Sequence, residues 1–172
     1  MKRVARFEKI SSDQFIKTID NLNSPVEKKD LYSVHKDIKM PKRATKGSAG
    51  YDFFLPYDLD LAPGQSTIIP SGIKVYIIEG WVLKIYPRSG LGFKYRLQLD
   101  NTVGIIDSDF YNNATDEGHI LIKLTNDGFE GKSIHLGKNT AYAQGIFVEY
   151  GITEEDEVVS TRNGGIGSTS SV

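Results

Sequence analysis

Short stretches of alternating apolar and polar residues, separated by turn residues, occupy the middle of this chain. Ile73, Val75 and Ile77 alternate with polar neighbours, and a second such stretch covers residues 120–125. Pro-Gly and Ser-Gly pairs precede the first of these stretches, and a Glu-Gly pair follows it. A period of two places alternate side chains on the buried face of a strand. Many short strands with almost no helical stretch among them predict an all-β barrel or sandwich.

One amphipathic helix is predicted ahead of the strand-rich part, over residues 11–22. A serine at position 11 or 12 is the expected N-cap, and Asn-Ser-Pro after residue 22 ends the helix. Its apolar residues recur at helical spacing: Phe15, Ile16, Ile19 and Leu22. We therefore expect one short amphipathic helix in this part of the chain.

Changes in composition divide the chain of 172 residues into three parts. Residues 1–33 are predicted to be an extension with one short helix, residues 34–150 a β domain, and residues 151–172 a flexible tail rich in glycine and hydroxyl groups. An apolar content of 39% suffices for one compact core. The tail has two interpretations, a disordered end or an arm that completes an active site.

Composition also excludes several classes of protein. The chain has no cysteine, which excludes a disulfide framework and thiolate chemistry and suits a reducing cytoplasm. No apolar run has membrane-spanning length, and the basic N-terminus lacks the apolar stretch of a signal peptide. A formal net charge of −1 gives no broad basic surface for nucleic acid. We expect a cytoplasmic protein that binds neither membrane nor nucleic acid.

Polar segments at the ends of predicted strands carry the candidate chemistry. Residues 88–90, Arg-Ser-Gly, offer a guanidinium, a hydroxyl and unobstructed backbone amides, which suit phosphate oxygens. Gln144 adds an amide on an apolar strand, and the tail brings Arg162 close to several glycines. Residues 104–110 place two carboxylates and a ring on what we expect to be the tip of a β-hairpin, although a solvated Asx turn is the plain alternative. Together these segments predict a polyphosphate ligand with Mg²⁺ bridging its oxygens.

Five polar segments follow one another along the chain: Ala49–Asp52, Arg88–Gly90, Asn101–Phe110, Ala143–Gln144 and Gly165–Thr169. In this order they resemble the five motifs of the trimeric dUTPase family. The resemblance covers about residues 38–172. It implies a jelly-roll β fold, a homotrimer whose active sites are shared between subunits, and Mg²⁺-dependent hydrolysis of dUTP to dUMP and pyrophosphate. Such a reaction keeps uracil out of DNA and supplies dUMP for dTTP synthesis.

The resemblance assigns a role to each matching residue. Asp107 would be the general base that activates water for attack on the α-phosphorus, and Phe110 would pack against the deoxyribose. Asp52 would support the hydration shell of a Mg²⁺ ion that no residue ligates directly, and Asp109 receives no role. The other implied substrate-binding residues contact the phosphates or the uracil. They are Arg88, Ser89, Gly90, Asn101, Ile105, Ile106, Leu121, Gln144, Arg162, Ile166, Gly167 and Ser168.

Some positions depart from the family pattern. Phe110 stands where the family usually has tyrosine, and Ile166 replaces the aromatic residue that normally covers the uracil. The second change removes a stacking contact of about 1–3 kcal/mol. The loop at residues 111–117 is an insertion.

Two other functions are weighed against dUTP hydrolysis. Lys123 occupies the place of the glutamate base that a related dCTP deaminase requires, so deamination is disfavoured. A non-catalytic, nucleotide-sensing regulator that binds a partner protein is the second alternative. It is motivated by the loop at 111–117 and the helix at 11–22, which the minimal fold lacks.

Overall fold

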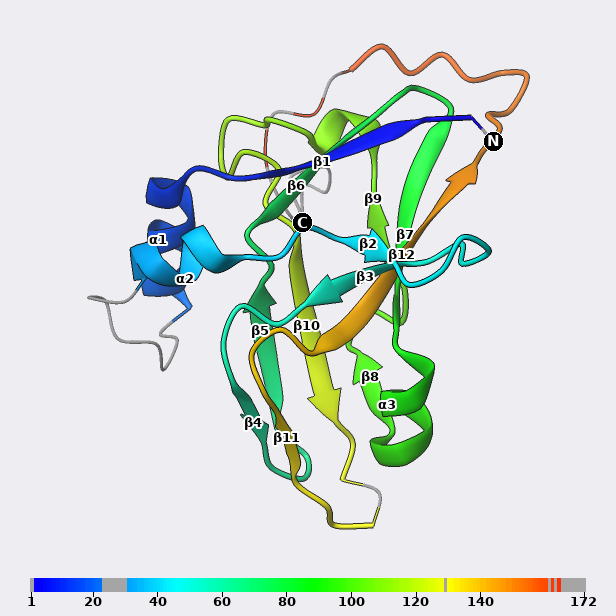
Figure 1. Ribbon diagram of the computed structural model, residues 1–172. Helices are drawn as coiled ribbons and strands as arrows, with labels where there is room; N and C mark the ends of the chain where they lie inside the picture. Colours follow the sequence, from blue (N-terminus) through cyan, green and yellow to red (C-terminus); the bar gives the residue numbers. More distant parts are fainter. Residues whose placement is uncertain (1, 23–30, 129, 161, 163, 165–172) are drawn as a thin grey trace.

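The computed structural model describes residues 2–22, 31–128, 130–160, 162 and 164 (Figure 1). The helices are α1 (Ser12–Asn21), α2 (Leu31–Asp37), α3 (Ser89–Tyr95) and the short 3₁₀ helix η2 (Ser108–Phe110). The strands are β1 (Ala5–Lys9), β2 (Lys42–Arg43), β3 (Tyr51–Phe54), β4 (Leu59–Leu61), β5 (Ser66–Pro70), β6 (Ile73–Ile77), β7 (Trp81–Pro87), β8 (Leu97–Leu99), β9 (Gly104–Ile106), β10 (Leu121–Asn126), β11 (Ile134–Leu136) and β12 (Ala141–Glu149). The predicted all-β fold with a short N-terminal helix is confirmed. None of the helices described is long and apolar enough to cross a membrane.

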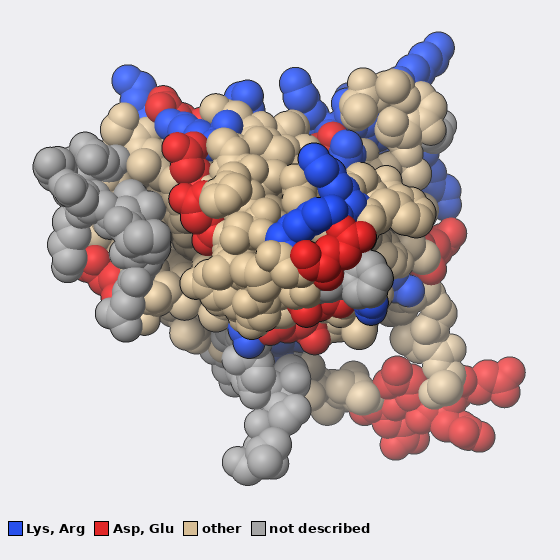
Figure 2. Space-filling model, turned by 90° about the horizontal axis from the view of Figure 1, so that it is seen from below, with Lys and Arg blue, Asp and Glu red and all other residues tan. Residues whose placement is uncertain are grey.

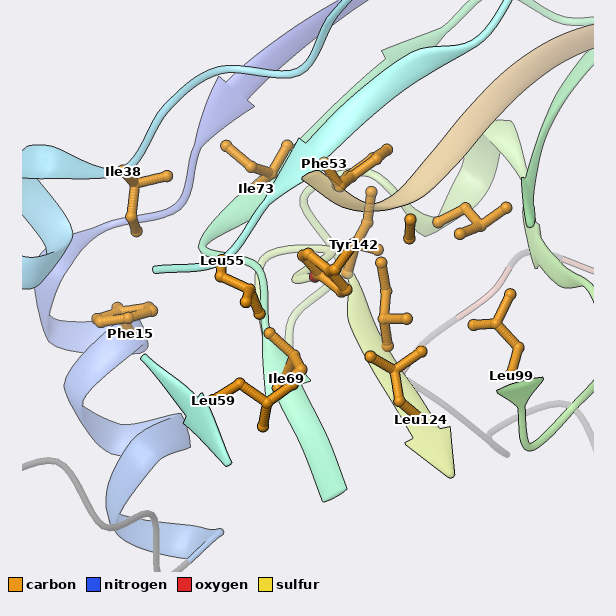
Figure 3. Packing of buried hydrophobic residues seen from close by; sticks show 14 of the residues in the cluster. Phe15, Ile38, Phe53, Leu55, Leu59, Ile69, Ile73, Leu99, Leu124 and Tyr142 are labelled. Carbon is orange, nitrogen blue, oxygen red and sulfur yellow. The ribbon is translucent and has the colours of Figure 1, made fainter. Parts of the chain in front are cut away.

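The strands form small antiparallel sheets around one core. The largest has the order β2-β3-β12-β7-β9, and a second has the order β5-β10-β8. Two further pairs, β1-β6 and β11-β4, complete the described sheets. Figure 3 shows side chains from several of these strands pointing into the same interior, with Tyr142 of β12 near its centre.

Both alternating stretches form the predicted strands. In β6, Ile73, Val75 and Ile77 are at most 2% exposed, whereas the side chains between them are more accessible. In β10, Ile122 and Leu124 are buried and the residue between them is exposed. The pattern was sufficient because one face of each strand packs on the core and the other faces water.

Helix α1 forms where its spacing predicts. The hydroxyl oxygen of Ser11 accepts a hydrogen bond from the backbone N–H of Gln14 at 3.1 Å, which is an N-cap. Phe15 and Ile19 are buried in the common core (Figure 3 shows Phe15). The sequence does not predict β1, α2 or α3. Strand β1 pairs with β6 along its whole length, so the first residues share the core of the β domain.

The predicted hairpin tip at residues 104–110 is wrong. Residues 104–106 form β9, an edge strand that pairs with β7, and Phe110 closes the next turn by donating its N–H to the Asp107 carbonyl at 3.2 Å. The chain reverses earlier, between β8 and β9, where Thr102 has φ of 61°. The isoleucine pair indicated extended backbone correctly, but local propensity does not specify which strand becomes the partner.

Candidate active site

A cavity of about 200 Å³ lies between β9 and the start of β10. Seven predicted site residues line it: Asn101, Ile105, Ile106, Asp107, Phe110, Leu121 and Arg162. Sequence reasoning missed four further lining residues: Ile85, Leu99, Gly104 and Ile122. Of these, Gly104 is constrained by space, because a Cβ atom there would lie 3.2 Å from the Cβ of Ile85.

The cavity has strand edges on two sides. Strand β9 is the last strand of its sheet, so within the described residues one edge has no neighbouring strand. Strand β10 pairs with β8 only from Leu124 onward, which leaves Leu121 and Ile122 without a strand partner on that side. Buried backbone N–H and C=O groups need hydrogen-bond partners. The two edges therefore offer donors and acceptors to a flat polar ligand.

The guanidinium of Arg162 bridges two carboxylates beside this cavity. Its Nη2 donates to Asp107 Oδ2 at 2.9 Å, and its Nε donates to Asp109 Oδ1 at 3.0 Å. It also lies 5.7 Å from the centre of the Phe110 ring. The side chain of Arg162 is 14% exposed, whereas those of the two aspartates are 47% and 51% exposed. Asp107 therefore remains accessible to water while it is paired.

Asp109 is a site residue that the sequence left without a role. Asp107 and Asp109 flank Ser108 at the start of η2, and this turn directs both carboxylates to the same guanidinium. The Asp-Ser-Asp spacing was the available signal. It could not be used because the third partner, Arg162, lies 53 residues further along the chain than Asp109.

A second polar cluster lies on the large sheet. Strand register places Gln144 of β12 between Asp52 of β3 and Tyr86 of β7. Arg88 Nη1 pairs with the buried carboxylate of Asp52, and Gln144 Nε2 donates to the Pro87 carbonyl at 3.1 Å. The cluster thus combines a charged fork and an amide at the end of β7.

The Arg-Ser-Gly segment begins helix α3, which the sequence did not predict. Arg88 is the N-cap of α3, and its carbonyl accepts hydrogen bonds from Leu91 and Gly92. Ser89 and Gly90 therefore occupy the first turn, where backbone N–H groups have no partner inside the helix. Two glycines make the intrinsic helix propensity low, so the structure overrides the local preference.

The single chain does not bring the two clusters into one cavity. Asp52, Arg88, Ser89, Gly90 and Gln144 do not line the cavity at Asp107 among the residues described. Strand β7 connects the two places, because Ile85 lines the cavity and Pro87 precedes the cluster. The predicted residues Ile166, Gly167 and Ser168 lie outside the described residues.

The charged groups do not form a metal cage in the part of the chain that the structure describes. No group of three or more His, Asp or Glu side chains there could hold a metal ion. Pairs of carboxylates instead suit Mg²⁺ that keeps several waters and is bound mainly by substrate phosphates. On the face seen in Figure 2, basic and acidic side chains are mixed over the main body, whereas acidic ones gather on the segment that projects at the lower right.

The fold is all-β, and it carries two separate polar regions, the cavity at Asp107 and the cluster at Arg88. The model of the dUTPase family matches residues 36–172. The deoxyuridine 5′-triphosphate nucleotidohydrolase of Lactococcus lactis is 40% identical over 134 residues, which cover 77% of this chain and 88% of the relative. The chain therefore belongs to the dUTPase family, which confirms the resemblance seen in the sequence.

Solved structures support the same conclusion. The dUTPase of Streptococcus mutans superposes with a TM-score of 0.64 at 28% identity, covering 86% of this chain and 98% of that one. A mutant dUTPase from phage phi11 of S. aureus, described with a structural Mg(II) ion, gives a TM-score of 0.62 at 19% identity and covers 92% of this chain and 98% of that one. The second likeness concerns the fold alone. The predicted jelly-roll type of fold is confirmed.

Proposed function

We propose that this protein hydrolyses dUTP to dUMP and pyrophosphate, with Asp107 as the general base. The observation that carries the proposal is the cavity in which Asp107, Phe110 and two unpaired strand edges meet. Family membership indicates the same substrate.

The strand edges account for selection of the base. Backbone groups of Ile105, Ile106 and Leu121 bind uracil, and Asn101 contributes from the turn before β9. Cytosine reverses a donor and an acceptor of the pyrimidine ring, so the same backbone groups would remain unpaired at a cost of about 1–3 kcal/mol each. The methyl group at the 5-position makes thymine larger than uracil, so the site would reject thymine. The ring of Phe110 packs on the deoxyribose and leaves no space for a 2′-hydroxyl.

The carboxylate of Asp107 carries the chemical step. It accepts a proton from a water molecule as the water oxygen forms a bond to the α-phosphorus. The bond from this phosphorus to the bridging oxygen breaks, and pyrophosphate leaves. Arg88, the amides of Ser89 and Gly90, Gln144 and Arg162 bind the phosphate oxygens, and Gly167 and Ser168 of the tail belong to the same set.

Magnesium enters this proposal with the substrate. Mg²⁺ bound to the triphosphate would reduce its negative charge and orient it. Asp52 is buried and holds the guanidinium of Arg88 in place, and its carboxylate would support the hydration shell of the ion. Ile166 would cover the uracil with weaker contact than an aromatic ring gives.

A homotrimer would unite the two polar clusters. The cluster at Arg88 and the cavity at Asp107 lie apart on one chain, and we propose that each cavity is completed by the cluster of a neighbouring subunit. We also propose a cytoplasmic location, which the absence of cysteine favours.

The two alternatives receive less support. Lys123, at the position where a deaminase needs its glutamate, pairs with Asp100 at 2.7 Å and does not line the cavity. The loop at 111–117 was one motive for a regulatory partner, but several of its side chains bind the chain's own N-terminal segment and β6. dUTP hydrolysis remains the proposal that the geometry supports best.

A substrate panel tests the proposal. The full chain is incubated with dUTP, dCTP, dTTP and UTP in the presence of Mg²⁺, and nucleotide products and pyrophosphate are separated. We expect dUMP and pyrophosphate from dUTP, with much slower turnover of the other three. Absence of pyrophosphate from dUTP would contradict the proposal, and formation of dUTP from dCTP would favour the deaminase.

A further inference from the structure

The loop of residues 111–117, which follows Phe110, is held together by one buried side chain. Asn113 is 9% exposed. Its Nδ2 donates to Asp116 Oδ1 at 2.7 Å, and its Oδ1 accepts from the backbone N–H groups of Thr115 at 3.0 Å and Asp116 at 3.1 Å. A buried amide with donor and acceptor both satisfied makes a loop rigid.

The N-terminal segment clamps this loop from outside. The backbone N–H and hydroxyl of Ser11 donate to the Glu117 carboxylate at 3.0 and 2.5 Å, and Lys74 Nζ lies 3.3 Å from the same carboxylate. The hydroxyl of Tyr111 donates to Glu8 Oε2 at 2.8 Å. Burial raises the pKa of Glu117, but the hydrogen bonds from Ser11 and Lys74 outweigh it and bring the pKa below its ordinary value. Glu117 is therefore an ionised anchor.

The loop also holds the backbone of the active-site ring. Asn113 Nδ2 donates to the carbonyl oxygen of Phe110 at 3.0 Å. Gly118, with φ of 79°, lies so close to this carbonyl that a Cβ atom would be 2.5 Å from the oxygen. Phe110 is 5% exposed and lines the cavity beside Asp107. Its backbone is thus fixed on one side by the turn from Asp107 and on the other by Asn113.

We propose that Asn113 is a positioning residue for Phe110, and that the clamp on Glu117 makes the N-terminal segment part of the sugar specificity of the site. This inference rests on the proposed function, in which Phe110 packs against the deoxyribose. A ring that cannot retreat excludes a 2′-hydroxyl, whereas a ring on a loosened backbone admits it. Neither Asn113 nor Glu117 lines the cavity, so both act through Phe110.

The test compares dUTP with UTP in the full-length protein. Wild type, Asn113→Ala, Glu117→Ala and the control Glu130→Ala are assayed for kcat and KM on both substrates, with thermal unfolding as a check on folding. Glu130 is a matched control because it also has a positive φ, 74° against 60° for Glu117, and also pairs with a lysine. Glu130 lies away from the cavity at Phe110.

We expect the ratio of kcat/KM for dUTP to kcat/KM for UTP to fall about tenfold in Asn113→Ala and Glu117→Ala, and to stay unchanged in Glu130→Ala. A structural role alone would lower both values in parallel and leave the ratio constant, which would overturn the inference. If Asn113→Ala does not fold, Glu117→Ala decides the question. Wild type without dUTP turnover would overturn the proposed function and this inference together, whereas normal turnover with a constant ratio would overturn only the inference.

Discussion

The cavity at Asp107 and the cluster at Arg88 use the same kinds of side chain but are built differently. In the cavity, Asp107 and Asp109 are about half exposed and share a guanidinium that comes from the distant tail. In the cluster, Asp52 of β3 is buried, and its partner Arg88 directly follows β7 of the same sheet. The guanidinium of Arg88, which we propose binds phosphate, is therefore preorganised, whereas the candidate base stays accessible to water. This difference suits a group that binds and a group that reacts.

The largest effect is expected when the proposed base, Asp107, is replaced. Asp107→Asn keeps the size of the side chain but removes its ability to accept a proton, so kcat for dUTP should fall by about 10²–10⁴-fold with little change in KM. Steady-state kinetics measure both. Turnover equal to that of wild type would remove Asp107 from the role of base.

Changing the preorganised fork should act mainly on binding. Lysine cannot form the planar fork of arginine, so Arg88→Lys should lower kcat/KM for dUTP by about 10–100-fold, chiefly through KM. The matched control is Arg96→Lys at the other end of α3, where the guanidinium pairs with Asp127. Equal kinetics for both variants would show that the cluster does not bind substrate.

The third prediction concerns the stability of the fold and not its activity, because His119 belongs neither to the cavity at Asp107 nor to the cluster at Arg88. Burial lowers the pKa of His119 to about 3; Glu117 opposes this shift and His35 adds to it. Gly72 N–H donates to its Nε2 at 2.9 Å, and Thr18 lies at its Nδ1.

Between pH 6.5 and 3, His119 is protonated in the unfolded chain and neutral in the folded protein. Its contribution to stability is therefore complete above pH 6.5 and is lost as the pH falls. The free energy of unfolding, measured with denaturant, should be about 2 kcal/mol lower at pH 5 than at pH 7.5. His119→Gln should flatten this dependence, and an equally steep profile in that variant would contradict the assignment.

The smallest expected effect concerns Asp109, the second of the two half-exposed carboxylates that pair with Arg162. Asp109→Asn removes one of the two charged partners of Arg162 and leaves Asp107 intact, so kcat/KM for dUTP should change by less than about fivefold. The variant serves as the control for Asp107→Asn. A loss as large as that of Asp107→Asn would mean that both carboxylates take part in the reaction.

Much of the fold was predictable because its local signals agree with its packing. The alternation in β6 and β10 identifies the buried face of each strand. The cap at Ser11 identifies the start of α1. Strand β1 carries charged residues on its outer side, and α3 contains two glycines, so their local signals are weak. These elements form because the rest of the structure provides their partners.

The site shows the same division. Roles for Arg88, Asp107 and Phe110 could be proposed from motifs, because residue type and order suggest the chemistry. The sequence did not show which distant segments pair. It did not show that β9 pairs with β7, or that Asp107 and Asp109 both bind the guanidinium of Arg162. Contacts between residues far apart in the chain are set by the whole fold, and no local pattern encodes them.

Mixing two impaired variants tests most directly whether the two regions are halves of one shared site. Differently tagged Asp107→Asn and Arg88→Ala chains are coexpressed, and oligomers that contain both are purified and assayed with dUTP. A ring in which each cavity meets the neighbour's cluster leaves about one intact site in three in every mixed trimer, so activity should return to about a third of the wild-type value. Mixed oligomers no more active than the two variants alone would contradict the account.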